Sequence, residues 1–192
     1  MTNIKTIGIA GCGTMGAGIA IVAARAGFRT IVFDERADAL EKARNQTQGF
    51  FAKSIEKGKL TSTRVDAIMD NLIGTTKIDD LAQCDLVIEA VFEDLKVKHA
   101  LLGALNKVCP THTVFASNTS TLSITEIAAG SGRDERVVGM HFCLPAQLMK
   151  LVEMSPGINT SDSAFQNAWE CCVALGQKPV KTKDNPGFIL NY

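Results

Sequence analysis

The order of apolar and polar positions predicts a strand, a helix and a second strand near the N-terminus. An apolar run covers residues 6–10, and Thr14–Ala26 follows it as an alanine-rich stretch without proline. Gly27 comes next, where a helix commonly ends in a left-handed cap. A second apolar run, Thr30–Phe33, then ends at Asp34. Continuous apolar runs on either side of a helix are typical of buried parallel strands.

The same alternation continues along the rest of the chain. Further strands are predicted at Leu72–Thr76, Leu86–Ala90, Val114–Ala116, Val137–Met140, Leu151–Met154 and, at an edge, Pro179–Lys181. Helices are predicted at Ala37–Lys57, Thr61–Met69, Asp94–Val108, Ile124–Ala129 and Ser161–Leu175. This order favours an α/β fold of Rossmann type, with a doubly wound and mainly parallel sheet. Residues from about 37 to 71 form a helical insertion that is longer and more charged than an ordinary crossover.

Three glycines join the first strand to the first helix. They are Gly11, Gly13 and Gly16, with Cys12, Thr14 and Met15 between them. The first glycine permits a sharp turn, the second lets backbone approach a pyrophosphate, and the third lets the helix pack closely on the strand. The N–H groups at the helix N-terminus then suit an anion. A glycine-rich turn without a ligand is the alternative for an isolated motif, but the surrounding strand–helix–strand order favours nucleotide binding.

Asp34 ends the second strand about 20 residues beyond the glycines, where an acid accepts hydrogen bonds from an adenosine ribose. A carboxylate at this place repels a 2′-phosphate, so the sequence predicts NAD rather than NADP. Arg36 is the one group nearby that could reach such a phosphate. We prefer the interpretation that it lies in a solvated loop.

Composition excludes several classes of protein. The chain has 192 residues, of which 46% are apolar, and its 20 basic and 20 acidic residues balance, without a basic run that would suit nucleic acid. Neither an apolar leader nor a stretch of membrane-spanning length is present, which predicts a cytoplasmic protein, with a removed organelle leader as the alternative. The six cysteines lack metal-like spacing, so we expect reduced thiols and no metal.

Three polar residues near predicted strand ends are candidates for chemistry. Ser120 follows the strand that contains Phe115, His141 follows Met140 directly, and Glu153 lies inside an apolar run. In doubly wound sheets the ligand lies off the carboxyl ends of the strands. A buried carboxylate needs a partner, and an imidazole would supply one while gaining the orientation of a general base. Taken singly, the three could be a core histidine, a solvated edge acid and a helix cap.

Six blocks of sequence, in this order, resemble the NAD-binding domain of the L-3-hydroxyacyl-CoA dehydrogenases. They are Gly11–Gly16, Glu89–Lys98, Phe115–Ser120, His141–Pro145, Leu151–Glu153 and Asp184–Asn191. Each block alone is a weak signal, whereas the six together span the whole chain. The resemblance implies NAD-dependent, reversible oxidation of an L-3-hydroxyacyl-CoA to the 3-ketoacyl-CoA.

The resemblance also assigns roles to residues. His141 would be the general base, oriented by Glu153, and Ser120 and Asn191 would hydrogen-bond the substrate's 3-oxygen. Cofactor contacts are implied for the glycine-loop residues 11–16, Asp34, Ala90, Glu93, Lys98, Asn118 and Ser120. Lys53 and Lys57, in the charged insertion, are candidates for the CoA phosphates, with a solvated helix face as the alternative.

Two departures from the family pattern keep alternatives open. Leu144 stands where the family usually has an asparagine, which leaves room for a related hydroxyacid or carnitine-type dehydrogenase. The family pattern continues into an all-helical C-terminal domain that completes the acyl-CoA site and forms a homodimer. We therefore expect residues 1–192 to be the NAD-binding domain alone, with 184–192 as its boundary segment and little activity by itself. A module that binds NAD without turnover is the alternative from another class.

Overall fold

The computed structural model describes residues 3–189 and has a single sheet of eight strands. The strands are β1 Thr6–Ala10, β2 Arg29–Phe33, β3 Leu72–Thr75, β4 Leu86–Glu89, β5 Val114–Ser117, β6 Val137–Phe142, β7 Leu151–Pro156 and β8 Lys178–Lys181. Their spatial order is β3-β2-β1-β4-β5-β6-β7-β8. The first six in chain order run parallel, whereas β7 pairs antiparallel with β6 and carries β8 beside it. The predicted doubly wound, mainly parallel sheet is confirmed.

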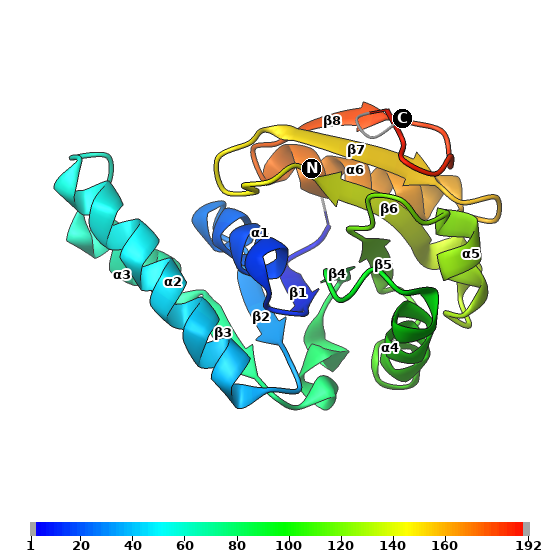
Figure 1. Cartoon of the computed structure of the whole chain (residues 1–192), viewed down its shortest axis with the longest axis horizontal. Helices are drawn as coiled ribbons and strands as arrows, with labels where there is room; N and C mark the ends of the chain where they lie inside the picture. Colours follow the sequence, from blue (N-terminus) through cyan, green and yellow to red (C-terminus); the bar gives the residue numbers. More distant parts are fainter. Residues whose placement is uncertain (1–2, 190–192) are drawn as a thin grey trace.

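Helices cover both faces of this sheet (Figure 1). They are α1 Thr14–Arg25, α2 Ala37–Glu56, α3 Ser62–Asp70, α4 Leu95–Val108, α5 Ile124–Ala129 and α6 Asp162–Ala174, with the short 3-10 helices η1 Ile78–Gln83 and η2 Asp134–Arg136. Apolar side chains of α1 and α6 join one buried cluster with the sheet. Those of α4 and α5 join another. Burial on both faces explains why the strands read as continuous apolar runs.

The predicted insertion forms a helical hairpin of α2 and α3 that extends away from the sheet (Figure 1). Thr61 caps α3, because its hydroxyl oxygen accepts a hydrogen bond from the backbone N–H of Arg64. Phe51, Val65 and Ile68 pack in a small core against Ile21 of α1. This core holds the hairpin against α1.

One predicted element boundary matters for the site. The sequence predicts a strand that ends at Met140, but β6 continues to Phe142, so His141 lies inside the strand rather than after it. The extension arises because antiparallel β7 supplies pairing partners beyond Met140: His141 lies opposite Glu153 and Phe142 lies opposite Val152. No helix among residues 3–189 is long and apolar enough to cross a membrane.

Candidate functional site

Of the three glycines in the loop between β1 and α1, only Gly13 has open space beside it. A Cβ atom on Gly16 would lie 1.8 Å from the carbonyl oxygen of Gly11, and one on Gly11 would lie 2.8 Å from that of Ala90. Both glycines are therefore required by the packing of the loop, and Gly11 also has a φ of +93°. A Cβ on Gly13 would instead meet open space. Gly13 is the N-cap of α1 and offers no side chain to cap the first turn, which suits an anion.

Asp34 follows β2 and lies against this loop. Its Oδ2 accepts hydrogen bonds from the backbone N–H of Cys12 at 3.0 Å and from the Cys12 thiol at 3.2 Å. Burial, together with the hydrogen bond to Asp34 and its negative charge, raises the pKa of the Cys12 thiol to about 12, so this thiol stays protonated. Arg36 lies exposed and forms an ion pair with Asp38. The arginine is thus exposed to solvent and paired with Asp38, in agreement with the preferred interpretation that it lies in a solvated loop.

The carboxyl ends of β1, β4, β5 and β6 form a continuous edge beside the loop. Ala90 donates its backbone N–H to the carbonyl oxygen of Ala10 at 2.8 Å, and Asn118 donates its backbone N–H to the carbonyl oxygen of Glu89 at 3.0 Å. The Asn118 side-chain oxygen in turn accepts a hydrogen bond of 2.9 Å from the N–H of Phe142. These bonds connect the glycine loop, step by step, to the strand that carries His141. A dinucleotide that starts at the loop would lie across this edge.

His141 and Glu153 meet as direct cross-strand partners. The His141 Nδ1 atom lies 2.7 Å from Glu153 Oε2, and the two side chains are 12% and 1% exposed. Glu153 Oε1 accepts a second hydrogen bond, of 2.8 Å, from the N–H of Ile189. A buried carboxylate with both oxygens engaged is held in one orientation, so it fixes the imidazole ring as well. The three sequence-predicted residues Ser120, His141 and Glu153 all lie at this edge of the sheet.

The segment Asp184–Ile189 closes over this pair. Asp184 accepts hydrogen bonds from the backbone N–H groups of Ile124 and Thr125 and from the hydroxyls of Ser123 and Thr125. These bonds anchor the segment to the N-terminus of α5. The buried Phe188 ring then stacks on the His141 ring, with centroids 5.9 Å apart and an angle of 30°. Asn191, predicted to contact the substrate, lies outside the described residues.

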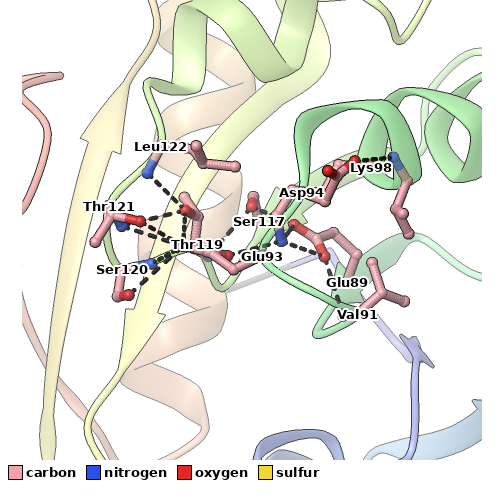
Figure 2. Close-up of polar contacts among 11 residues, drawn as sticks. Glu89, Val91, Glu93, Asp94, Lys98, Ser117, Thr119, Ser120, Thr121 and Leu122 are labelled. Atoms are coloured by element: carbon pink, nitrogen blue, oxygen red, sulfur yellow. Dashed lines mark hydrogen bonds and ion pairs between the residues drawn. The ribbon is translucent and has the colours of Figure 1, made fainter.

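A buried ion pair lies beneath Ser120. Figure 2 shows Lys98 pointing toward Glu89, while Glu93 points toward residues 119–121. The Lys98 Nζ atom lies 2.8 Å from Glu89 Oε1 and 3.2 Å from Glu93 Oε2. Lys98 is 1% exposed and Glu93 is 38% exposed. The resemblance implies a cofactor contact for both, and of the two only the Glu93 side chain is exposed in this structure.

Glu93 is held ionised by its surroundings. Burial by itself raises the pKa of Glu93, but the hydrogen bond from the Thr119 hydroxyl and the charge of Lys98 outweigh it and lower this pKa to about 2. Backbone N–H groups of Ser120 and Thr121 donate to the same oxygen, Oε1, at 2.9 and 3.2 Å. The ionised carboxylate therefore organises the loop after β5.

We expect the stability contributed by Glu93 to disappear in acid. Its ordinary pKa of 4.5 falls to about 2 on folding, so the contribution is full above the ordinary value and is lost as the pH falls through the folded one. Because the side chain is more than a third exposed, solvent screening limits the effect to about 1–2 kcal/mol. Urea unfolding at pH 7, and at pH values from about 4.5 down to about 2, measures it.

The variant Glu93→Gln should be less stable than the wild type at pH 7, and its free energy of unfolding should fall less steeply as the pH falls to about 2. The variant Glu35→Gln, at an exposed position, is the control and should follow the wild type. Parallel curves for wild type and Glu93→Gln would contradict the assignment.

The remaining candidate residues lie away from this edge of the sheet or are exposed in loops. Lys53 lies in the last turn of α2 and Lys57 at its C-cap, both exposed on the hairpin rather than near the strand ends. Leu144 is 63% exposed in the loop after β6. All six cysteines are free thiols. Residues 3–189 contain no group of three or more His, Cys, Asp or Glu side chains that could hold a metal ion.

Four residues of the site lie inside the blocks that resemble the family, but the sequence predicted no role for them: Glu89, Thr119, Phe188 and, as an anchor, Asp184. Glu89 carried a usable signal, because it ends the apolar run Leu86–Glu89 just as Glu153 interrupts another. Both acids are buried in the structure. Phe188 carried none, since its contact with His141 joins distant parts of the chain.

Known proteins are similar to this chain in sequence and fold. The family model described as "3-hydroxyacyl-CoA dehydrogenase, NAD binding domain" matches residues 6–185. The chain is 42% identical over 191 residues to a 3-hydroxyadipyl-CoA dehydrogenase of Escherichia coli, and 39% identical over 189 residues to a probable 3-hydroxybutyryl-CoA dehydrogenase of Bacillus subtilis. The matched residues are 100% and 98% of this chain, but only 40% and 66% of those relatives.

A solved structure of (S)-3-hydroxybutyryl-CoA dehydrogenase from Ralstonia eutropha superimposes with a TM-score of 0.96 at 36% identity. It covers 98% of this chain, which spans 66% of that structure. The matched range contains the glycine loop, Asp34 and the His141–Glu153 pair. The chain belongs to the family of NAD-binding domains of the 3-hydroxyacyl-CoA dehydrogenases.

Proposed function

We propose that this domain binds NAD and performs proton transfer in a dehydrogenase that interconverts L-3-hydroxyacyl-CoA and 3-ketoacyl-CoA. The observation that carries the proposal is the hydrogen bond between His141 and the buried Glu153, at the carboxyl edge of the sheet that begins at the glycine loop. A buried polar pair of this kind contributes little net stability. Its geometry, however, suits a general base held by a carboxylate.

The proton-transfer step follows from the atoms of the pair. The Nδ1–H of His141 donates to Glu153, which leaves the lone pair on Nε2 to accept the proton of the substrate hydroxyl. Glu153 stabilises the resulting imidazolium without taking its proton. Ser120, and Asn191 outside the described residues, are proposed to hydrogen-bond the 3-oxygen. Bound NAD would accept the hydride that leaves the carbon bearing this hydroxyl.

The cofactor subsite is proposed to start at the glycine loop. Residues 11–16 would hold the pyrophosphate, with Gly13 giving the closest approach and the N-terminus of α1 favouring its charge. Asp34 would exchange its bond from Cys12 for hydroxyls of the adenosine ribose. Ala90, Glu93 and Asn118 would line the path toward His141, since they lie along the edge that joins the two ends.

We expect a strong preference for NADH over NADPH. Binding of NADH with a Kd of about 1 μM, or about −8 kcal/mol, would be ordinary for such a site. A 2′-phosphate would face the Asp34 carboxylate, and we expect the Kd of NADPH to be at least about 100-fold higher. Fluorescence titration with both nucleotides measures the ratio.

Arg36→Gln is the matched control, because Arg36 pairs with Asp38 and should leave both affinities unchanged. Equal affinities of the wild type for NADH and NADPH would contradict the role of Asp34.

The substrate and assembly of the whole protein remain proposals. Lys53 and Lys57 would meet the CoA phosphates only if the α2–α3 hairpin faces the substrate. A C-terminal helical domain, a homodimer and a cytoplasmic location are the expectations that accompany the family.

The direct test of function is turnover by the full-length protein with acetoacetyl-CoA and NADH, compared with gulonate and carnitine with NAD. Reduction of acetoacetyl-CoA alone is the expected result. Turnover of gulonate or carnitine instead would assign a related dehydrogenase, and NADH binding without any turnover would assign a binding module.

A further inference from the structure

The segment that closes over the proposed base begins with a tight turn. The N–H of Phe188 donates to the carbonyl oxygen of Asn185 at 3.0 Å. Pro186 and Gly187 lie between them, and Gly187 has a φ of +84°. Proline at the second position and a glycine with positive φ at the third are the features of a type II turn. Because Asp184, just before the turn, is held at the N-terminus of α5 (Figure 1), the turn has a fixed starting point.

Phe188 leaves this turn in an unusual backbone conformation. Its φ is +50°, and among residues 3–189 it is the one residue other than glycine with a positive φ. A side chain disfavours this conformation, so it persists only where the surrounding structure enforces it, and such residues are common at functional sites. Directly after it, the N–H of Ile189 donates to Glu153 Oε1 at 2.8 Å. The backbone of Phe188 therefore directs the next amide at the carboxylate.

The Phe188 side chain contacts the other member of the pair. Its ring is 6% exposed and belongs to the buried cluster that includes Ile124 and Ile127 of α5. It stacks on the His141 ring, with centroids 5.9 Å apart and an angle of 30°. The hydrogen bond to Glu153 fixes Nδ1 of the imidazole, but a ring can still pivot about a single bond of this kind. A closely packed flat ring against the imidazole restricts that pivot and with it the movement of Nε2.

We propose that Phe188 is a positioning residue that acts on both members of the pair and so sets the place of His141 Nε2. Its backbone orients Glu153 through the N–H of Ile189, and its ring holds the plane of the imidazole. The inference rests on the proposed function, in which Nε2 accepts the proton of the substrate hydroxyl. A displacement of about 1 Å at such an atom can lower the rate of a reaction by about 100-fold.

The first test removes the flat ring and keeps an apolar side chain. Phe188→Leu does this and leaves the backbone constraint in place, since leucine at positive φ is as disfavoured as phenylalanine. Phe165→Leu is the matched control, because Phe165 of α6, at the opposite face of the sheet, makes a comparable contact with Trp169, with centroids 6.0 Å apart. Both variants are made in the full-length protein, and kcat, KM for acetoacetyl-CoA and the Kd of NADH are measured.

We expect Phe188→Leu to lose at least about tenfold in kcat. Its KM and its Kd for NADH should stay within about threefold of the wild-type values, and Phe165→Leu should keep all three quantities within that range. A wild-type kcat in Phe188→Leu would overturn the proposal. A fall in kcat of the same size in the control would also overturn it, because the loss would then reflect general destabilisation. A rise in KM or in the NADH Kd as large as the fall in kcat would assign Phe188 to binding instead of positioning.

Amide hydrogen exchange tests the backbone contribution without reference to turnover. Gly187→Ala keeps the Phe188 ring but places a side chain at a φ of +84°, which strains the turn. The N–H of Ile189 should then exchange at least about tenfold faster than in the wild type. Gly27→Ala, at a φ of +93° before β2, is the control and should leave this exchange unchanged. Wild-type exchange of Ile189 in Gly187→Ala, or an equal increase in the control, would contradict the proposal.

Failure of the proposed function would appear instead as a wild type that does not turn over acetoacetyl-CoA, and the exchange of Ile189 would still test the positioning. If Phe188→Leu does not fold, Phe188→Met replaces it, because methionine fills irregular apolar space with a flexible chain and has no flat ring. A wild-type kcat in that variant rejects the proposal.

Discussion

Replacing His141 by glutamine in the full-length protein is expected to lower kcat for acetoacetyl-CoA reduction by about 10²- to 10⁴-fold, the usual contribution of a positioned general acid or base. Glutamine has a similar reach, and its amide oxygen can accept a hydrogen bond from the substrate hydroxyl. Its amide cannot take up the proton that the imidazole Nε2 accepts. The Kd of NADH should stay within about threefold of the wild-type value, since the proposed function places His141 at the substrate rather than at the cofactor. Steady-state kinetics and a fluorescence titration provide the two numbers.

Glu153→Gln is the companion variant for this prediction. It keeps the cross-strand contact but supplies an amide to His141 Nδ1, so the ring loses its carboxylate partner and its fixed tautomer. We expect kcat to fall, but by less than in His141→Gln. The free energy of unfolding should fall as well, because an amide replaces a buried carboxylate. Full turnover by His141→Gln would remove the imidazole from the mechanism.

Substituting Gly13 by alanine is expected to abolish NADH binding without harming the fold. The new Cβ would meet no protein atom within 4 Å, and the residue has an ordinary φ of −61°. The methyl group would instead occupy the space proposed for the pyrophosphate. Loss of two charge-assisted hydrogen bonds of about 1.5–3 kcal/mol each corresponds to a Kd at least about 100-fold higher.

Gly49→Ala is the matched control, because a Cβ at this helical position also meets open space but lies far along α2. It should stabilise the protein by up to about 1 kcal/mol and leave the NADH Kd unchanged. Gly13→Ala should keep its free energy of unfolding within about 1 kcal/mol of the wild type. Normal NADH affinity in Gly13→Ala would place the pyrophosphate elsewhere.

Local patterns were sufficient to predict the elements of the fold. Apolar runs bounded by glycine or polar residues identified the inner strands of the sheet, because helices cover both of its faces there, whereas the edge strands β3 and β8 are less buried. The glycine loop and Asp34 were predictable for a related reason: their spacing along one strand–helix–strand unit fixes their place in space.

Contacts between distant segments were not predictable from pattern alone. The sequence indicated that Glu153 needs a buried partner, but it did not indicate that β7 runs antiparallel to β6, which is what places the acid opposite His141. The resemblance implied a cofactor contact for Lys98, but no local pattern indicated that its side chain is buried against Glu89. The return of Phe188 onto the His141 ring likewise depends on the anchor of Asp184 at α5.

His141, held by Glu153, is proposed to transfer a proton beside a nicotinamide bound along the carboxyl edge of the sheet. A crystal structure of the full-length protein with NAD and acetoacetyl-CoA would locate all of these groups at once. We expect the 3-oxygen within hydrogen-bond distance of His141 Nε2, with Nδ1 still bonded to Glu153 and the pyrophosphate against Gly13. A complex in which the 3-oxygen lies away from His141, or in which the ring has turned from Glu153, would contradict it.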